Sequence, residues 1–515
     1  MTDSPDLFTP DPTQAEINRA LWSACDTFRG VVDPESYKSY ILTFLFFKYL
    51  SDVWADTRER LAAEHDDPAL VARKLARQPF VIPDGETFAD VVAKRNDTDL
   101  GQTIDTALHA IEDANDDRLG GVLTRVSYNS PSLGQTKDRN ARLRDLVQNF
   151  ARPLLDFRPS QTGKADRIGD AYMFLISMFA STAGKKGGEF YTPREVTDLL
   201  AELLDAQPGE RVCDPAIGSG SLAIAVAEAV GGPDVALYGQ ESNGDTWALC
   251  QMNMVLHGFT GARVEWGNTL TEPRLLSDDG RLMTFDVVVA NPPFSLKKWG
   301  HEAAARDEHK RFHRGMPPRS RGDYAFVSHI AETLAPGTGR AAIVVPHGVL
   351  FRGGAEGRIR RALLDEGLVE AVIGLPEKLF FGTGIPAAVL VLRRDRPTTD
   401  VLFIDASAHY TAGTRQNALG PDDVARITSA YRAFRDGGDG FQDKFSYRAT
   451  RDQIAGNDDN LNIPRYVDTF EPAPAVDLAA VQADLDRIDG ELADVRAEMR
   501  RHLATLGLAD EVPGA

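Results

Sequence analysis

Asn291, Pro292, Pro293 and Phe294 are the residues whose types and order most clearly indicate chemistry in this chain. They follow the apolar run 285–290, which is typical of a buried strand in an open α/β sheet, and such sheets bind ligands beyond the carboxyl ends of their strands. The Asn291 side-chain oxygen and the Pro292 carbonyl could accept both hydrogens of an exocyclic amino group, and Phe294 could stack on its ring. Such a pocket could hold a flipped-out base for chemistry on its amino nitrogen.

A second motif is the glycine-rich turn 214–221, which joins the strand-like run 211–213 to the helical pattern 222–226. Glycine lets the backbone approach a ligand closely. The turn lacks the third glycine of the dinucleotide fingerprint, and no Gly-Lys-Ser/Thr follows it as in a phosphate loop. Asp214 at the strand end instead suits a ligand that carries an ammonium group and little phosphate.

Two further polar residues follow predicted strands. Glu241 comes after the apolar run 236–240, where a carboxylate can accept hydrogen bonds from a ribose, and Asn268 comes after 263–266. The intervals that separate these residues from Asp214 and from the tetrapeptide 291–294 are each close to the length of one strand-helix unit. We therefore expect all of these side chains at one edge of the sheet.

Residues 188–194, of sequence Gly-Glu-Phe-Tyr-Thr-Pro-Arg, precede these motifs. In this order, 188–194, the glycine-rich turn, the two polar strand ends and the tetrapeptide resemble the DNA methyltransferases that methylate amino groups with S-adenosylmethionine. The chain looks most like the modification subunit of type I restriction-modification systems. The resemblance covers nearly the whole chain, because 21–52 is similar to the helical domain of that family and 459–466 to its closing signature.

The resemblance implies a role for each motif. Residues 190–192 would wrap the methionine end of S-adenosylmethionine, the glycine-rich turn would lie beneath it, and Glu241 would hold the ribose. Asn268 stands where many relatives carry an aspartate that binds the adenine of the cofactor, and its amide oxygen can still accept that bond. The cofactor-binding residues implied are Glu189, Phe190, Tyr191, Thr192, Pro193, Arg194, Asp214, Gly218, Ser219, Gly220, Ser221, Glu241 and Asn268.

The reaction implied is methylation of the N6 amino group of adenine in DNA. The amino nitrogen is a weak nucleophile, and two acceptors on its hydrogens draw it toward tetrahedral geometry as it attacks the sulfonium methyl in line. Positioning and electrostatics therefore supply most of the acceleration, without a strong base or a metal. The catalytic residues implied are Asn291, Pro292, Pro293 and Phe294.

The composition agrees with a cytoplasmic enzyme. Three scattered cysteines, Cys25, Cys213 and Cys250, in 515 residues fit a reducing compartment and show no metal-ligand spacing. The polar, acidic start of the chain has no signal-peptide pattern. The apolar stretch 40–50 is too short to span a bilayer and contains a lysine, so we expect it to form a buried helix.

The formal net charge of −19 opposes contact with DNA phosphates, so this chain alone should bind DNA weakly. Basic residues nevertheless gather directly after the tetrapeptide, on the substrate side of the predicted pocket. A solvated loop would have the same composition, but the position favours contacts with the phosphates that flank a flipped base. The DNA-binding residues expected are Lys297, Lys298, Lys310, Arg311, Arg314, Arg319 and Arg321.

The chain is expected to be an α/β protein in three parts. Apolar residues at helical spacing predict a helical domain over 1–165, which would contact DNA or partners. Alternating strands and helices over 166–470 predict a methyltransferase domain with a Rossmann-like seven-strand sheet. Its later strands would be 341–345, 369–373 and 387–392.

The third part, 471–515, begins with a proline-containing linker and continues as one coiled-coil-like helix. Its apolar residues step alternately by three and four and need a partner helix, although packing within the chain would also cover them. By resemblance the partner is the specificity subunit, in a complex with double-stranded DNA and a second copy of this chain; whether a restriction (nuclease/translocase) subunit joins is left open. The stripe consists of Leu478, Val481, Leu485, Ile488, Leu492, Val495 and Met499.

Three other functions fit parts of this pattern. Cytosine N4 methyltransferases use the same pocket but more often have serine at the Asn291 position. Protein glutamine methyltransferases usually have tyrosine at the Phe294 position, in shorter chains without flanking helical regions. A non-catalytic scaffold that binds cofactor and DNA in a defence complex is a further alternative, against which the intact tetrapeptide argues.

Overall fold

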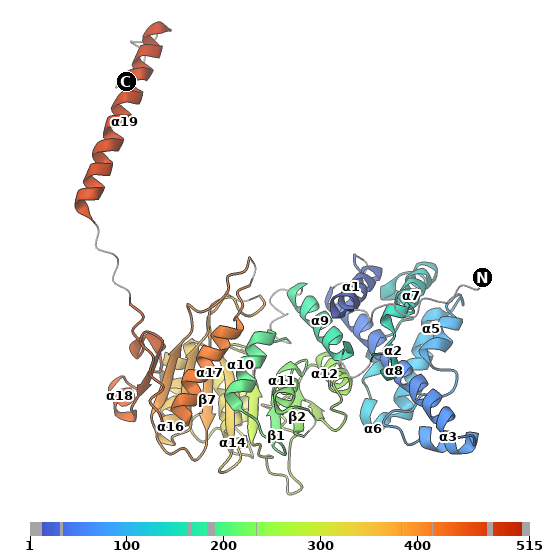
Figure 1. The fold of residues 1–515 in the computed structure, drawn as a ribbon. Helices are drawn as coiled ribbons and strands as arrows, with labels where there is room; N and C mark the ends of the chain where they lie inside the picture. The colour runs from blue at the N-terminus through green and yellow to red at the C-terminus, as the bar shows by residue number, and fades with distance from the viewer. Residues whose placement is uncertain are drawn as a thin grey trace. The chain divides into compact units, whose positions relative to one another are not determined.

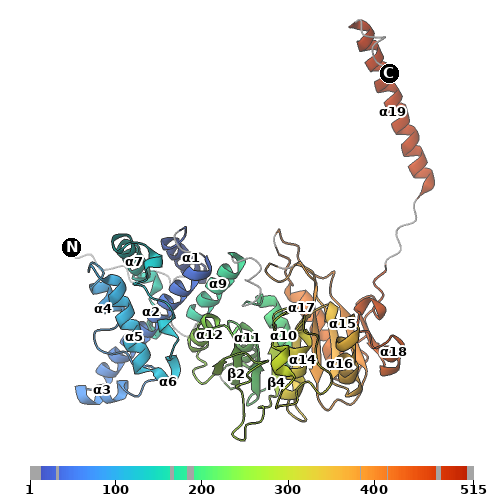
Figure 2. The ribbon, with the colours of Figure 1, turned by 180° about the vertical axis from the view of Figure 1, so that it is seen from behind.

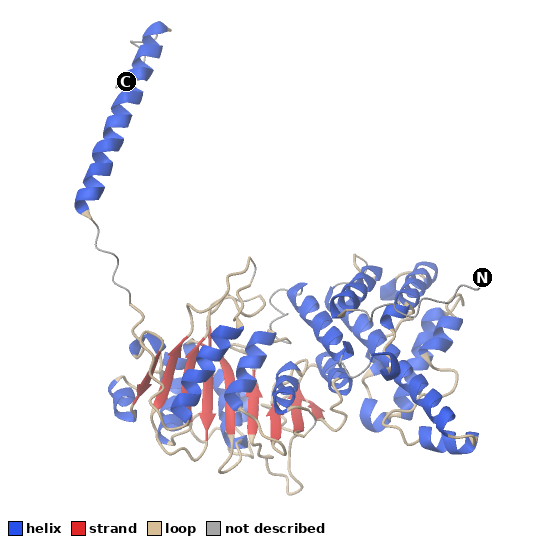
Figure 3. Ribbon diagram, in the orientation of Figure 1, coloured by secondary structure: helices blue, strands red, loops and turns tan. Residues whose placement is uncertain are grey.

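The computed structural model describes residues 13–30, 34–162, 167–182, 191–232, 234–382, 384–414, 416–470 and 477–506 of the 515-residue chain. The chain divides into two compact units, Met1–Asp468 and Thr469–Ala515. The first unit contains a group of helices followed by a large sheet with helices on both faces, and the second contains one long helix (Figures 1 and 3).

Up to Thr182, the regular elements of the described residues are all helices. α1 begins with a capping box, in which Thr13 and Glu16 each accept the backbone N–H of the other, so two donors that a helix start leaves unpaired are satisfied. The α-helices and short 3₁₀ helices (η) are α1 (Gln14–Ala24), η1 (Cys25–Thr27), α2 (Pro34–Glu64), α3 (Pro68–Leu75), α4 (Phe88–Ala93), α5 (Leu100–Ala114), α6 (Asp116–Leu119), η2 (Leu123–Arg125), η3 (Pro131–Leu133), α7 (Thr136–Phe150), η4 (Pro153–Leu155), α8 (Pro159–Thr162) and α9 (Arg167–Thr182).

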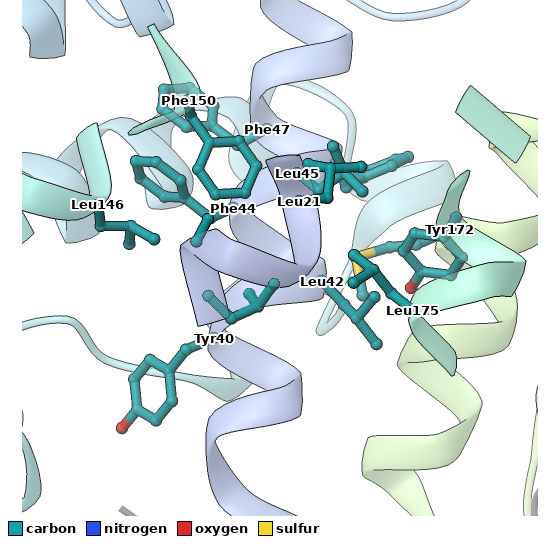
Figure 4. Close-up of a cluster of buried hydrophobic side chains, with 14 of the residues drawn as sticks. Leu21, Tyr40, Leu42, Phe44, Leu45, Phe47, Leu146, Phe150, Tyr172 and Leu175 are labelled. Carbon is teal, nitrogen blue, oxygen red and sulfur yellow. The ribbon is translucent and has the colours of Figure 1, made fainter. Parts of the chain in front are cut away.

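An aromatic core holds these helices together (Figure 4). Phe44 of α2 packs edge-on against Phe150 of α7, with ring centroids 5.2 Å apart. Tyr40, one turn earlier, packs edge-on against Tyr128 at 5.4 Å. Such pairs add about 0.5–1.5 kcal/mol to the free energy of burial. The expectation of a buried helix over 40–50 is confirmed, since α2 is the central helix of this core.

The helical core continues into the sheet-containing part through α12 (Gly244–Leu256). Leu249 and Met252 of α12 are buried in the same cluster as the α2 and α9 side chains. The Tyr172 hydroxyl of α9 also donates to the Leu249 carbonyl at 3.3 Å. The helical part therefore rests on the helix that follows Glu241, close to the predicted cofactor site.

The strands of the described residues form one nine-stranded sheet with the spatial order β3-β2-β1-β4-β5-β7-β6-β8-β9. β7 is antiparallel to β5 and β6, and β9 is antiparallel to β8; the other neighbouring pairs are parallel. The strands are β1 (Arg211–Asp214), β2 (Ala236–Glu241), β3 (Arg263–Trp266), β4 (Val287–Ala290), β5 (Arg340–Pro346), β6 (Val369–Gly374), β7 (Ala387–Arg393), β8 (Val401–Asp405) and β9 (Ser446–Ala449).

The predicted class of fold is confirmed, but the predicted number of seven strands is wrong. The three later strands expected from the sequence are present as β5, β6 and β7. β8 and β9 extend the sheet beyond β6. β8 is an apolar run that ends in Asp405 and that the prediction omitted. β9 is a four-residue edge strand, Ser-Tyr-Arg-Ala, whose short polar sequence carries little strand signal.

Helices cover both faces of the sheet, as Figures 1 and 2 show from opposite sides. Val287 and Val289 of β4 pack toward α10 (Arg194–Leu204), α11 (Ser221–Val230) and α17 (Pro421–Arg435). Val288 and Ala290 pack toward α14 (Asp323–Thr333) and α16 (Gly354–Asp365). Burial on both faces explains why β4 is apolar throughout. The remaining elements of this part are α13 (His301–Ala304), α15 (Gly348–Phe351), α18 (Arg451–Gly456) and η6 (Ile463–Arg465).

α19 (Leu478–Thr505) makes up most of the described part of the second unit. Asp477 caps its start, because its carboxylate accepts from the N–H groups of Ala479 and Ala480. No residue of α19 is buried, and the seven apolar residues of the predicted stripe are between 42% and 76% exposed. None of the described helices combines the length and apolar character needed to cross a membrane.

Candidate active site

The tetrapeptide 291–294 leaves the sheet at its carboxyl edge. β4, which lies between β1 and β5, is buried on both faces, and the chain emerges at Asn291. The half-buried Asn291 side chain donates from Nδ2 to the Thr192 Oγ1 at 3.1 Å. Because Thr192 holds the amide nitrogen, the amide oxygen is the atom left to accept from a ligand.

Asp214, Glu241 and Asn268 lie at the same carboxyl edge of the sheet as the tetrapeptide. β3, β2, β1 and β4 are parallel neighbours, so the residues at or just after their carboxyl ends lie side by side. Thr192, which precedes α10, reaches this edge through its hydrogen bond with Asn291. The geometry thus joins the segment predicted to hold the methionine end of the cofactor to the amide predicted to hold the base.

Aromatic rings line the region around the tetrapeptide. The Phe294 ring packs edge-on against Phe380, with centroids 6.1 Å apart, and Tyr191 packs against Phe381 at 5.9 Å. Burial raises the pKa of the Tyr191 hydroxyl to about 12, so this side chain stays neutral. The sequence prediction missed Phe380 and Phe381, which follow β6. Their aromatic type was the one sequence feature that could have indicated a role in this site.

The glycine-rich turn uses backbone conformations that favour glycine. Gly218 and Gly220 have φ of 56° and 86°. A Cβ at Gly220 would lie 2.8 Å from the Met254 Cε and 3.0 Å from the Cys250 Sγ, so α12 packs directly against the turn. The side-chain amide of Asn253 on α12 also donates to the Ser219 carbonyl at 2.8 Å. These contacts with α12 hold the turn in place.

Asp214 is 1% exposed, and its two carboxylate oxygens have different surroundings. Its Oδ1 accepts from the Ala216 N–H at 2.9 Å. Its Oδ2 is buried and has no hydrogen-bond partner among the described residues, and the same holds for the Ser219 Oγ. Burial raises the pKa of Asp214 to about 8, and the nearby Glu241 carboxylate contributes to the rise. A buried carboxylate oxygen without a hydrogen-bond partner is stabilised by a positively charged donor.

Glu241 connects β2 to the glycine-rich turn. Its Oε2 accepts from the Gly218 N–H at 3.1 Å, and its Oε1 accepts from the Asn243 N–H at 2.7 Å. Burial raises the pKa of Glu241 above its usual value, and these backbone hydrogen bonds oppose the rise. Each oxygen keeps a lone pair that can accept from a hydroxyl group.

A cavity of about 410 Å³ lies beside Glu241. Asn268 lines it, but the Asn268 Oδ1 already accepts from the Leu270 N–H at 2.9 Å and the Thr271 N–H at 3.4 Å, so its local role is to shape this turn. Lys38 of α2 also lines the cavity and was not predicted, since nothing in the sequence ties it to this edge. The lining consists of Lys38, Pro215, Ala216, Gln240, Glu241, Ser242, Asn243, Thr246, Asn268, Thr269, Pro293, Leu296 and Phe326.

The remaining predicted cofactor residues have different positions. Glu189 and Phe190 lie outside the described residues. Pro193 precedes α10 as its N-cap, and Ser221 is the first residue of α11. Arg194 is exposed, and its guanidinium group lies 3.8 Å from the Asp170 carboxylate. It lines a cavity of about 320 Å³ together with Tyr191, Thr192 and Ser221, and its contact with a cofactor stays a prediction.

Comparisons with known proteins identify the family. Residues 163–473 match the N-6 DNA methylase family, and residues 17–150 match the HsdM N-terminal domain. The chain is 31% identical to the methylase subunit of the type I restriction enzyme MpnII from Mycoplasma pneumoniae, over 94% of this chain and 95% of that one. The chain belongs to the type I methylase subunits. It is a DNA methyltransferase specific for the N6 position of adenine.

Other relatives agree with this assignment. The HindI methylase subunit of Haemophilus influenzae is 32% identical, over 79% of this chain and 93% of that one. The structure of a type I restriction-modification methyltransferase subunit from Streptococcus thermophilus is 34% identical, with a TM-score of 0.79 over 89% of this chain and 100% of that one. The helical part and the mixed sheet therefore both belong to the fold of this family.

Two of the basic residues predicted to bind DNA are buried in the methylase subunit. Arg311 is 2% exposed; it forms an ion pair with Asp307 at 2.8 Å and donates to the carbonyls of Thr269 and Leu270. The Arg314 side chain is 3% exposed and binds Glu332 and Glu366, both at 2.6 Å.

These contacts correct the prediction for Arg311 and Arg314. Their guanidinium groups are already paired with carboxylates and carbonyls inside the protein, so they are not available to phosphates. Arg311 instead ties the loop after the tetrapeptide to the turn after Asn268. The exposed members of the basic stretch are Lys297, Lys298, Lys310, Arg319 and Arg321, of which Arg319 pairs with Glu302.

Proposed function

We propose that this methylase subunit takes its methyl group from S-adenosylmethionine, bound against the glycine-rich turn and Glu241. The buried Asp214 Oδ2 supports this cofactor, because an unpaired buried carboxylate oxygen is costly and an ammonium group is a donor that fits it. Glu241 borders the cavity of about 410 Å³ and can accept from ribose hydroxyls. When bound, S-adenosylmethionine supplies a methyl group carried on a sulfonium.

The residues of the tetrapeptide then hold the target adenine. The Asn291 Oδ1 and the Pro292 carbonyl accept the two hydrogens of the N6 amino group, and the Phe294 ring stacks on the base. Two acceptors on one amino group draw its lone pair away from the ring, and they hold the nitrogen in line with the methyl group. The observation that carries this assignment is the hydrogen bond from the Asn291 Nδ2 to Thr192, which occupies the amide nitrogen and leaves the amide oxygen to accept from the base.

The cofactor affinity should depend on pH through Asp214. In the empty site its pKa is about 8, whereas an ammonium beside it favours the carboxylate. Binding below pH 8 must therefore release a proton from Asp214, and the affinity should rise from pH 6 to pH 8 by up to about tenfold per pH unit. Calorimetry in that range, below the pKa of roughly 8 of the cofactor's own amino group, measures this dependence.

Asn variants provide the control for this prediction. Asp214→Asn should weaken binding at pH 8 by about 1.5–3 kcal/mol and should remove most of the pH dependence. Asp286 precedes β4, at the opposite edge of the sheet, and its carboxylate accepts from the Arg211 N–H. Asp286→Asn should therefore leave the affinity for S-adenosylmethionine unchanged. Equal affinity of the protein and Asp214→Asn at pH 8 would remove Asp214 from the cofactor site.

We also propose how the parts of the chain divide the work. The helical domain 1–165 and the exposed basic residues of the methyltransferase domain 166–470 would contact DNA, and the segment 471–515 would hold the specificity subunit. The net charge of −19 supports a requirement for partners, because it opposes DNA binding by this chain alone. A second methylase subunit and a restriction subunit would join the complex, in the cytoplasm where its DNA is found.

The reaction product tests this proposal. The chain, purified with its specificity subunit and incubated with duplex DNA and S-adenosylmethionine, should produce N6-methyladenine, measured by mass spectrometry of the digested nucleosides. N4-methylcytosine would show that the pocket accepts a different base. Methylation of a protein glutamine would reassign the substrate, and cofactor binding without any transfer would favour the scaffold function.

A further inference from the structure

The backbone directly after the tetrapeptide has an unusual conformation. Ser295, the residue that follows Phe294, has a φ of 53°. This left-handed region is uncommon for residues other than glycine, and a residue stays there only when its surroundings hold it. The turn at Ser295 ends the catalytic loop, so whatever holds Ser295 also limits where the Phe294 ring can point.

Asp323 is the group that holds this turn. It is the first residue of α14 and is 3% exposed. Its Oδ1 accepts from the Ser295 N–H at 2.7 Å. The short distance and the burial indicate a charge-assisted hydrogen bond, which is stronger than one between neutral groups. The residue therefore anchors the end of the catalytic loop to the start of a helix in the sheet's cover.

The second oxygen of Asp323 is fixed as well. Arg352 Nη1 lies 3.3 Å from Asp323 Oδ2 and 3.2 Å from Glu356 Oε1. Glu356 is 1% exposed, and burial raises its pKa, while Arg352 opposes this rise. Arg352 thus holds the Asp323 carboxylate in one orientation, with Oδ1 aimed at Ser295. The N-terminal end of α14 also favours a negative charge at this position.

The packing around the start of α14 leaves Asp323 little freedom to move. A Cβ on Gly322, the preceding residue, would lie 2.8 Å from the Trp299 Cβ. Trp299 is fully buried in the loop that follows the tetrapeptide, and its indole N–H donates to the Pro318 carbonyl at 2.9 Å. The next residue, Tyr324, donates from its hydroxyl to the Val349 carbonyl at 3.0 Å. Asp323 is thus held from both sides while it binds Ser295.

We propose that Asp323 is a positioning residue for methyl transfer. By accepting a hydrogen bond from the Ser295 N–H, Asp323 fixes the left-handed turn after Phe294. This turn orients the Phe294 ring and the Pro292 carbonyl toward the target base. This inference rests on the proposed roles of the tetrapeptide 291–294. An acidic residue at a helix start often serves only to stabilise that helix, so the test must separate the two roles.

Glycine at position 295 separates them. Glycine adopts the left-handed conformation readily, so it needs no anchor to hold the turn. Asp323→Ala should lower kcat by about 10- to 100-fold, the effect expected of a misplaced catalytic group, while the Kd for S-adenosylmethionine stays within about twofold. Ser295→Gly alone should keep kcat within about threefold. The double variant should regain at least about tenfold of the lost kcat, which a role confined to helix stability would not allow.

A second series does not depend on how Asp323→Ala folds. Asn tolerates the left-handed region, whereas a β-branched residue does not. Ser295→Asn should therefore keep most of the activity, and Ser295→Val should lose about tenfold or more in kcat. Glu356→Gln is the matched control, because it alters the group beside Arg352 without touching the Ser295 contact; its kcat should stay within about threefold.

Each outcome decides the proposal. The loss in Asp323→Ala, its recovery in the double variant and the order of the Ser295 series support a positioning role. No recovery in a folded double variant, or a Ser295→Val variant as active as the Gly variant, would overturn it. Asn291→Ala in the same assay keeps the two proposals apart. If Asn291→Ala remains active, the proposed role of the tetrapeptide fails. If Asn291→Ala is inactive but Ser295→Gly does not restore the activity of Asp323→Ala, only the proposed role of Asp323 fails.

Discussion

Replacing Asn291 with alanine is expected to reduce methyl transfer by at least about 100-fold, because the variant loses one of the two acceptors on the target amino group. The Kd for S-adenosylmethionine should change by no more than a few-fold, since the hydrogen bond of Asn291 to the described part of the cofactor segment is the one to Thr192. Single-turnover methylation of a duplex by the assembled complex measures the first quantity, and calorimetry on the same preparation measures the second.

Thr192 offers a matched pair of controls for this result. Thr192→Val keeps the shape of the side chain but removes the hydroxyl that binds the Asn291 amide, so the amide can turn its nitrogen toward the base. Thr192→Ser keeps the hydroxyl. The valine variant should lose about tenfold or more in kcat, and the serine variant should retain most of its activity. Near-normal transfer by Asn291→Ala would contradict the base-binding role of the tetrapeptide.

The parts of the site that the sequence could predict are those with a local cause. A polar residue after an apolar run must leave the sheet at the end of its strand, and parallel neighbours bring such ends together. Asp214, Glu241 and the tetrapeptide share an edge for this reason. The helix over 40–50 and the strands β5, β6 and β7 have equally local signals, namely apolar runs of the right length and period.

The parts that the sequence could not predict depend on contacts between distant segments. A basic residue after the tetrapeptide has the same local pattern whether it faces solvent or the interior. Arg311 is buried because Asp307, Thr269 and Leu270 surround it, and two of these come from another loop. The carboxylates that bind Arg314 stand on helix α14 and after α16, so burial of this guanidinium depends on tertiary packing.

For Asn268 and Ser295, too, the sequence could not predict which group each residue hydrogen-bonds. Asn268 follows a strand as expected, yet its amide oxygen binds the backbone two residues on. Ser295 has no sequence feature that marks a left-handed residue, and its conformation depends on Asp323, which comes from a separate helix. Residue type and spacing predicted which segments meet at the edge, and the side-chain partners within that edge required the structure.

Deleting residues 476–515 is expected to prevent assembly with the specificity subunit and to abolish sequence-specific methylation. The stripe on α19 exposes seven apolar side chains, and burying each leucine, isoleucine, valine or methionine against a partner helix would contribute about 1.5–3 kcal/mol. Met1–Asp468 is a compact unit without α19, so the truncated protein should stay folded. Co-purification measures assembly, and calorimetry of S-adenosylmethionine binding measures the integrity of the remaining unit.

Substitutions on two sides of α19 separate the apolar stripe from the helix itself. Leu485→Glu with Leu492→Glu places two charges in the stripe and should prevent assembly, because a charge buried in a helix seam is unfavourable. Ala483→Glu with Ala497→Glu places the same charges on the opposite side of the helix, at positions five residues after Leu478 and Leu492. This second variant should assemble normally. Assembly by the truncated protein, or equal effects of the two pairs, would show that the stripe does not hold the partner.

The isolated full-length chain should bind duplex DNA weakly and without sequence preference, since its net charge of −19 repels phosphates and the target-recognising subunit is missing.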